Sequence, residues 1–135
     1  MIRVAILGST GSIGKSALQV IARHPDHFQV VTLAANRRVE ELWAQVERFG
    51  PQRAVLADES VPLPASSSPT RWTSGRQALL AAAADPEVDV VLNALVGATG
   101  LEPTLTALEA SLRRNGYAAP TGAGVDAALA VFAGS

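Results

Sequence analysis

Three glycines spaced three residues apart, Gly8, Gly11 and Gly14, stand between an apolar run and an amphipathic run near the start of the chain. Residues 4–7 are all apolar and predict a short buried strand. Apolar residues then recur at helical spacing and predict a helix over residues 13–23. Glycine lets the backbone turn tightly and approach a ligand closely, and the free amides at a helix start favour an anion. The corner therefore predicts a site for the pyrophosphate of a nucleotide.

Strand-like and helix-like segments alternate along the chain, separated by glycine and proline. The patterns predict strands at residues 4–7, 28–33, 54–56 and 88–93, helices at 13–23, 39–49 and 77–84, and an irregular, serine- and proline-rich loop at 59–71. A second glycine-rich turn at residues 97–100 leads into a further helix, with Pro103 in its first turn. Such alternation predicts βαβ units, and hence a single α/β domain with a Rossmann-like, doubly wound, mostly parallel sheet.

Composition narrows the function classes. The chain has 135 residues, enough for one domain, with a net charge of −1 that argues against a nucleic-acid partner. It contains no cysteine, which excludes disulfides, zinc–thiolate sites and a cysteine nucleophile. No apolar run is long enough to span a membrane, and the first residues lack the pattern of a signal peptide. We therefore expect a cytoplasmic protein that does not associate with membranes.

The same turn carries part of a P-loop, the phosphate-binding motif of ATP and GTP hydrolases. Gly14-Lys15-Ser16 matches the end of that motif, but the motif also requires glycine at the position of Ser9. A P-loop protein commonly needs an acidic residue for magnesium after a later strand, where this chain has the neutral Asn93. A P-loop NTPase is therefore the weaker alternative, and a dinucleotide site is favoured.

The end of the second predicted strand indicates which dinucleotide. Folds that bind NAD usually place Asp or Glu there to accept hydrogen bonds from the ribose. This chain has no acid at that position and instead reads Asn36-Arg37-Arg38 after two alanines. Two guanidinium groups would bind a 2′-phosphate, which a carboxylate would repel. Surface arginines at a helix start are common, but beside the glycine turn they favour NADPH over NADH.

Several runs of residues together resemble one known family, the 1-deoxy-D-xylulose 5-phosphate reductoisomerases. The runs occur in the family's order over about residues 1–110, and they are residues 6–16, 25–28, 30–31, 34–37, 54–59 and 89–105. Collinear similarity of this kind is far more specific than a glycine motif. It implies a Rossmann-like NADPH-binding domain within an oxidoreductase of the non-mevalonate route to isoprenoids.

The resemblance also implies an activity and residue roles. Members of the family convert 1-deoxy-D-xylulose 5-phosphate, a phosphosugar, to 2-C-methyl-D-erythritol 4-phosphate as homodimers, using NADPH and a divalent metal, Mg²⁺ or Mn²⁺. By position, the pyrophosphate would be held by Thr10, Gly11, Ser12 and Ile13. Asn36, Arg37 and Arg38 would hold the 2′-phosphate end, and residues 97–100 would lie near the nicotinamide half.

The resemblance ends near Ala110, and residues 111–135 form a divergent tail with a turn and an apolar helix. Three origins of the tail stay open: a remnant of a deleted catalytic region, a foreign tail on a truncated chain, or a frame-shifted product. The family's metal ligands and substrate-phosphate residues lie further along its sequence and have no counterpart here. The acidic residues of this chain are scattered, and its adjacent pairs, Glu40-Glu41 and Asp58-Glu59, are predicted as solvated. No catalytic residue or metal ligand is therefore assigned, and we expect NADPH binding without turnover. A non-catalytic NADPH-binding module is the alternative.

Overall fold

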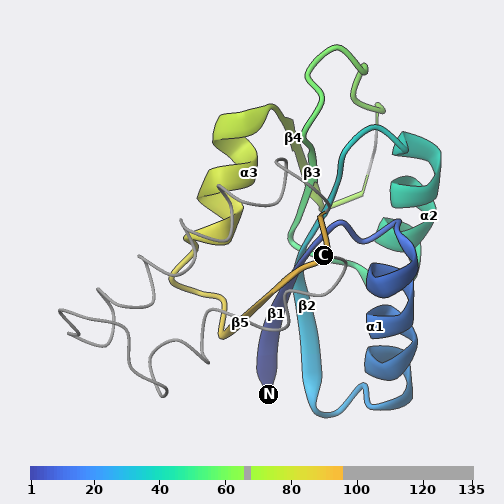
Figure 1. The fold of residues 1–135 in the computed structure, drawn as a ribbon. Helices are drawn as coiled ribbons and strands as arrows, with labels where there is room; N and C mark the ends of the chain where they lie inside the picture. Colours follow the sequence, from blue (N-terminus) through green and yellow to red (C-terminus); the bar gives the residue numbers. More distant parts are fainter. Residues whose placement is uncertain (66–67, 96–135) are drawn as a thin grey trace, which may run out of the picture.

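The computed structural model describes residues 1–65 and 68–95. Strands and helices follow one another along this part of the chain (Figure 1). In chain order they are β1 (Ile2–Leu7), α1 (Ser12–Arg23), β2 (Phe28–Ala35), α2 (Val39–Phe49), β3 (Arg53–Leu56), β4 (Arg71–Ser74), α3 (Arg76–Ala83) and β5 (Val90–Asn93).

The strands form one sheet in the order β4-β3-β2-β1-β5, and every neighbouring pair is parallel. After β1 the chain adds strands toward one edge, and it then returns to place β5 on the other side of β1. The order therefore reverses between β1 and β5, beside the carboxyl end of β1. Ligands of open α/β sheets bind at such a switch point. The predicted Rossmann-like, doubly wound α/β fold is confirmed.

Helices cover both faces of the sheet, with α1 and α2 on one face and α3 on the other (Figure 1). Side chains of β1 alternate between the two layers: Val4 and Ile6 pack with α1 and α2, whereas Ala5 and Leu7 pack with α3. Because both faces are covered, all four of these side chains are buried. The apolar run that predicted a buried strand thus reflects burial on two sides.

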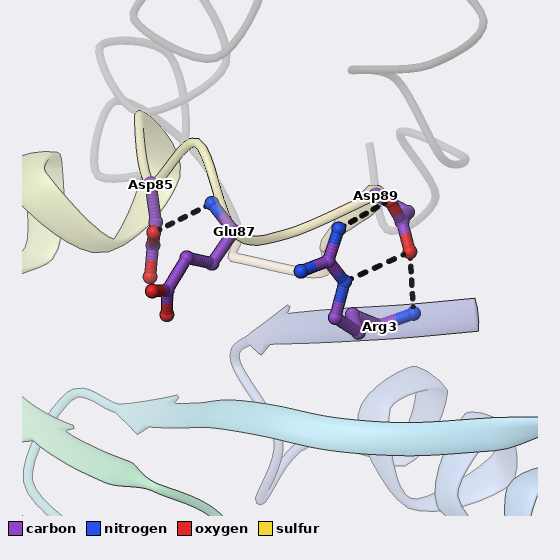
Figure 2. A network of polar contacts seen from close by, with 4 residues as sticks. All are labelled: Arg3, Asp85, Glu87 and Asp89. Carbon is purple, nitrogen blue, oxygen red and sulfur yellow. Dashed lines mark hydrogen bonds and ion pairs between the residues drawn. The ribbon is translucent and has the colours of Figure 1, made fainter. Parts of the chain in front are cut away.

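The amino ends of β1 and its neighbour β5 are joined by an ion pair between Arg3 of β1 and Asp89, which precedes β5 (Figure 2). Asp89 accepts a hydrogen bond from the backbone amide of Arg3 at 2.9 Å and two from its guanidinium at 3.2 and 3.3 Å. The backbone amide of Asp89 donates in return to the carbonyl of Arg3 at 2.8 Å. These bonds hold β5 in register with β1 and lower the pKa of the Asp89 carboxyl below its usual value.

The structure departs from the sequence prediction at the sheet edge. The predicted strands and helices are confirmed within a few residues, but β4 was missed, and the predicted loop 59–71 included its first residue, Arg71. The strand is short and polar, and only Trp72 on it packs against the core of α1 and α2. It forms because β3 offers it a free edge.

The predicted turn at 97–100, the helix after it and the tail lie outside the described residues. Within residues 1–65 and 68–95, no helix is long and apolar enough to cross a membrane.

Candidate functional site

The glycine turn leaves the sheet at the carboxyl end of β1. Gly8 has φ +88°, a conformation that favours glycine, and its amide and that of Ser9 both donate to the carbonyl of Ala34, at 2.7 and 2.9 Å. A β-carbon on Gly8 would lie 2.9 Å from the backbone of Ala94, which follows β5. The turn is therefore packed between the ends of β2 and β5, at the switch point of the sheet.

The last glycine of the turn is needed for packing within the protein. Gly14 lies in the first turn of α1 and is buried. A β-carbon there would lie 2.3 Å from the carbonyl oxygen of Gly8 and 2.6 Å from the Cα of Ser9. Contacts this short do not occur, so only glycine lets α1 begin directly against the turn.

The middle glycine has no such packing role. A β-carbon on Gly11 would meet, among the described residues, only the carbonyl oxygen of Gly8, at an ordinary 3.6 Å. Gly11 is the N-cap of α1, and no side chain caps the helix or places a carboxylate in its first turn. The amides of that first turn have no partner within the helix. The space in front of Gly11 and these amides fit a closely approaching anion such as a pyrophosphate.

The other predicted residues of the turn differ in accessibility. Ser12 is exposed and Ile13 is half-buried, so both lie at the surface of the helix start. Thr10 is only 6% exposed and is buried in the turn. Ser9 is fully buried, and its carbonyl accepts a hydrogen bond at 2.9 Å from the side-chain amide of Gln45 on α2. Gln45 thus connects the turn to α2.

Asn36, Arg37 and Arg38 follow β2 at the same edge of the sheet, and all three are exposed. The Nε of Arg37 lies 3.2 Å from a carboxylate oxygen of Asp58, which follows β3. The carbonyl of Asn36 accepts a hydrogen bond from the Asp58 amide at 3.0 Å. The structure therefore brings the glycine turn and the arginines together, because both follow the carboxyl ends of neighbouring strands.

A small charge network links α1 to the start of α2. Glu41 of α2 lies 3.2 Å from the Lys15 ammonium group on α1 and 3.7 Å from the Arg38 guanidinium. Lys15 is thus paired with a carboxylate. The side-chain oxygen of Asn93, at the end of β5, accepts a hydrogen bond from the backbone amide of Leu95 at 3.1 Å. Asn93 is neutral where a P-loop protein commonly has an acid for magnesium.

Sequence reasoning missed two residues that support this edge, Gln45 and Asp58. Asp58 was predicted as a solvated surface acid, but its side chain is only 27% exposed and it pairs with Arg37. The signal for Asp58 was the serine two residues later, since Asp-x-Ser is typical of a local side-chain-to-backbone turn. Nothing in the sequence indicated Gln45, because its partner is 36 residues away.

Comparison with known proteins decides the family. The sequence profile of the family described as 1-deoxy-D-xylulose 5-phosphate reductoisomerase matches residues 4–113. The chain belongs to this family. The resemblance found over about residues 1–110 is therefore confirmed.

Reductoisomerases with curated names are similar over most of the chain. That of Saccharophagus degradans is 45% identical over 119 residues, which cover 84% of this chain and 30% of that protein. That of a Janthinobacterium species is 47% identical over 119 residues, with the same coverage. The chain thus spans about 30% of the length of these reductoisomerases.

Solved reductoisomerase structures share the fold. The enzyme from Zymomonas mobilis in complex with NADPH superposes with a TM-score of 0.74 at 35% identity, over 82% of this chain and 30% of that one. A reductoisomerase in complex with NADPH, fosmidomycin and magnesium has a TM-score of 0.74 at 33% identity, over 82% of this chain and 28% of that one.

Within residues 1–65 and 68–95 of this chain, no three His, Asp or Glu side chains gather as metal ligands. We assign no metal ligand to this part of the chain.

Proposed function

We propose that the chain binds NADPH at the carboxyl edge of its sheet and forms the cofactor-binding domain of a reductoisomerase. One observation carries the proposal. The glycine turn, where a β-carbon on Gly11 would make only one ordinary contact among the described residues, lies beside two exposed arginines, and the end of β2 carries no acid that would accept hydrogen bonds from the ribose hydroxyls. A site of this kind suits a dinucleotide with an additional phosphate. The NADPH in a solved reductoisomerase of the same fold supports this proposal.

Each residue has a proposed part in binding. The backbone of Thr10, Gly11, Ser12 and Ile13 would hold the pyrophosphate at the positive end of the α1 dipole. Asn36 would contact the adenosine ribose by its amide, and Arg37 and Arg38 would bind the 2′-phosphate through charge-assisted hydrogen bonds. The carboxylates of Asp58 and Glu41 already hold the two arginines at this edge.

The activity of the reductoisomerases is proposed for the enzyme of which this domain is part. Its substrate would be the phosphosugar 1-deoxy-D-xylulose 5-phosphate, and it would act as a cytoplasmic homodimer. When bound, NADPH supplies a hydride for the reduction of a carbonyl group. The described residues bind and orient that cofactor, and no proton transfer is assigned to them.

Cofactor titration of Arg37→Ala tests the proposal. The dissociation constants for NADPH and NADH would be measured by fluorescence titration of the 135-residue chain and of the variant. Loss of a charge-assisted bond to the 2′-phosphate should weaken NADPH binding by about 1.5–3 kcal/mol, or roughly 10- to 150-fold. NADH binding should not change, because NADH has no 2′-phosphate.

Arg23→Ala is the matched control. Arg23 is an exposed arginine in the last turn of α1, at the opposite end of that helix from the glycine turn. Its removal changes the net charge equally and should leave both affinities as they are. An equal loss of NADPH and NADH affinity in Arg37→Ala would contradict the assignment of Arg37 to the 2′-phosphate.

A further inference from the structure

Asp58 occupies a fixed position beside Arg37. Its side chain is 27% exposed, whereas the side chain of Arg37 is 69% exposed, so the acid is the more buried member of the pair. One carboxylate oxygen, Oδ1, accepts hydrogen bonds from the Ser60 amide at 2.9 Å and the Ser60 hydroxyl at 2.6 Å. The other oxygen, Oδ2, remains for Arg37 at 3.2 Å. Ser60 and Arg37 therefore use opposite oxygens of one carboxylate.

The surroundings also keep this carboxylate charged and close to β2. The hydrogen bonds from Ser60, together with the charge of Arg37, lower the pKa of Asp58 below its usual value. The backbone amides of Ala57 and Asp58 donate to the carbonyls of Ala35 and Asn36, at 2.9 and 3.0 Å. The loop after β3 is thus tied to the turn after β2, and the anion is held next to the arginine.

The Arg37 side chain stays largely exposed in this contact. The ion pair with Asp58 is made at the Nε of Arg37, and the Arg37 side chain is 69% exposed. A guanidinium presents its donors in a rigid planar fork that matches a phosphate. A phosphate can therefore approach the terminal nitrogens while the carboxylate keeps the Nε.

We propose that Asp58 is a positioning residue that orients Arg37 toward the 2′-phosphate of NADPH and thereby contributes to the preference for NADPH over NADH. The inference rests on the proposed function, because it requires Arg37 to bind that phosphate. Holding a long side chain in place before the ligand arrives lowers the ordering cost of binding. Because an exposed ion pair contributes little by itself, the effect is moderate.

The test compares Asp58→Asn, Arg37→Ala and the double variant in the full 135-residue chain. NADPH and NADH dissociation constants are measured for each by fluorescence titration, after thermal unfolding has shown that the variant is folded. Asp58→Asn should weaken NADPH binding about two- to fivefold and leave NADH binding unchanged. Adding Asp58→Asn to Arg37→Ala should have no further effect, because Asp58 acts through Arg37.

Glu59→Gln is the charge control. Glu59 is the neighbouring acid, but its carboxylate lies against Gly75 at the start of α3. This variant should leave the ratio of NADPH to NADH affinity unchanged.

Ser60→Ala is a second test if Asp58→Asn fails to fold, since it removes a hydroxyl that donates a hydrogen bond to the carboxylate. It should lower NADPH affinity selectively and by less than Asp58→Asn.

Three results would overturn the inference: unchanged or tighter NADPH binding in Asp58→Asn, an equal loss of both cofactors, or additive effects in the double variant. Tighter binding would mean that the carboxylate repels the phosphate. If Arg37→Ala is selective for NADPH and Asp58→Asn is not, the inference alone fails. If Arg37→Ala itself leaves the cofactor preference unchanged, the proposed role of Arg37 fails with it.

Discussion

The backbone of Gly14 lies so close to Gly8 that a β-carbon on Gly14 would be 2.3 Å from the carbonyl oxygen of Gly8. Gly14 is therefore required by the backbone of the turn, whereas Gly8 is required by its positive φ and by the backbone of Ala94. A β-carbon on Gly11, between them, would meet only the Gly8 carbonyl oxygen among the described residues, at an ordinary 3.6 Å. The three glycines thus separate into two that build the turn and one that leaves room for a ligand.

Gly14→Ala should destabilise the fold. The added methyl group forces α1 away from the turn, and overpacking of this kind costs about 1–3 kcal/mol or more. Urea unfolding followed by tryptophan fluorescence would measure the loss. An unchanged unfolding midpoint would show that the contact between α1 and the turn is looser than the structure has it.

Gly11→Ala should instead fold nearly as well as the unmodified chain and bind NADPH more weakly. The backbone of Gly11, with φ −79° and ψ 172°, is one that alanine adopts without strain. The methyl group would project into the space proposed for the pyrophosphate, so NADH binding should weaken as well. NADPH and NADH titrations and urea unfolding curves of this variant test the prediction. Full cofactor affinity would contradict the placement of the pyrophosphate in front of Gly11.

Gln45→Ala should lower both stability and cofactor affinity by a small amount. Its side-chain amide donates to the Ser9 carbonyl, and the net contribution of such a hydrogen bond is about 0.5–1.5 kcal/mol. Gln19 and Gln45 both line a groove between α1 and α2, and Gln19 is exposed, so Gln19→Ala is the control. Equal effects of the two substitutions on NADPH affinity would argue against a supporting role of Gln45 for the turn.

Asp89 should make stability depend on pH in the acid range. Its pKa is lowered in the folded state by the hydrogen bonds from Arg3, so its contribution is present above the unfolded-state pKa of about 3.9. That contribution is lost as the pH falls through the folded-state value. Asp89→Asn should therefore lower the urea midpoint at neutral pH and weaken its dependence on pH below about 4.

Glu87→Gln is the control for that experiment. Glu87 lies two residues before Asp89 and is exposed, and Figure 2 draws no hydrogen bond between it and Arg3. The control should keep the neutral-pH stability and the full acid dependence of the unmodified chain. An acid dependence that persists unchanged in Asp89→Asn would assign it to other carboxylates.

Much of the fold and part of the site could be predicted from local patterns. The run before Gly8 is apolar because β1 is buried on both faces, and the spacing of Leu42 and Val46 reflects one buried face of α2. Asn36 and the two arginines were found because they follow directly after a predicted strand. In each case the signal lies within a few residues, which is the range over which periodicity and turn chemistry act.

What the sequence by itself determined is the order of these elements, the glycine turn and the charge at the end of β2. Only the tertiary structure decided that Arg71–Ser74 joins the sheet, because an edge strand this polar depends on the free edge of β3. It also decided that Gln45 supports Ser9 and that Asp58 holds Arg37. The physical reason is distance along the chain. Parallel strands bring together residues that follow different strands, and no local pattern records which of them will meet.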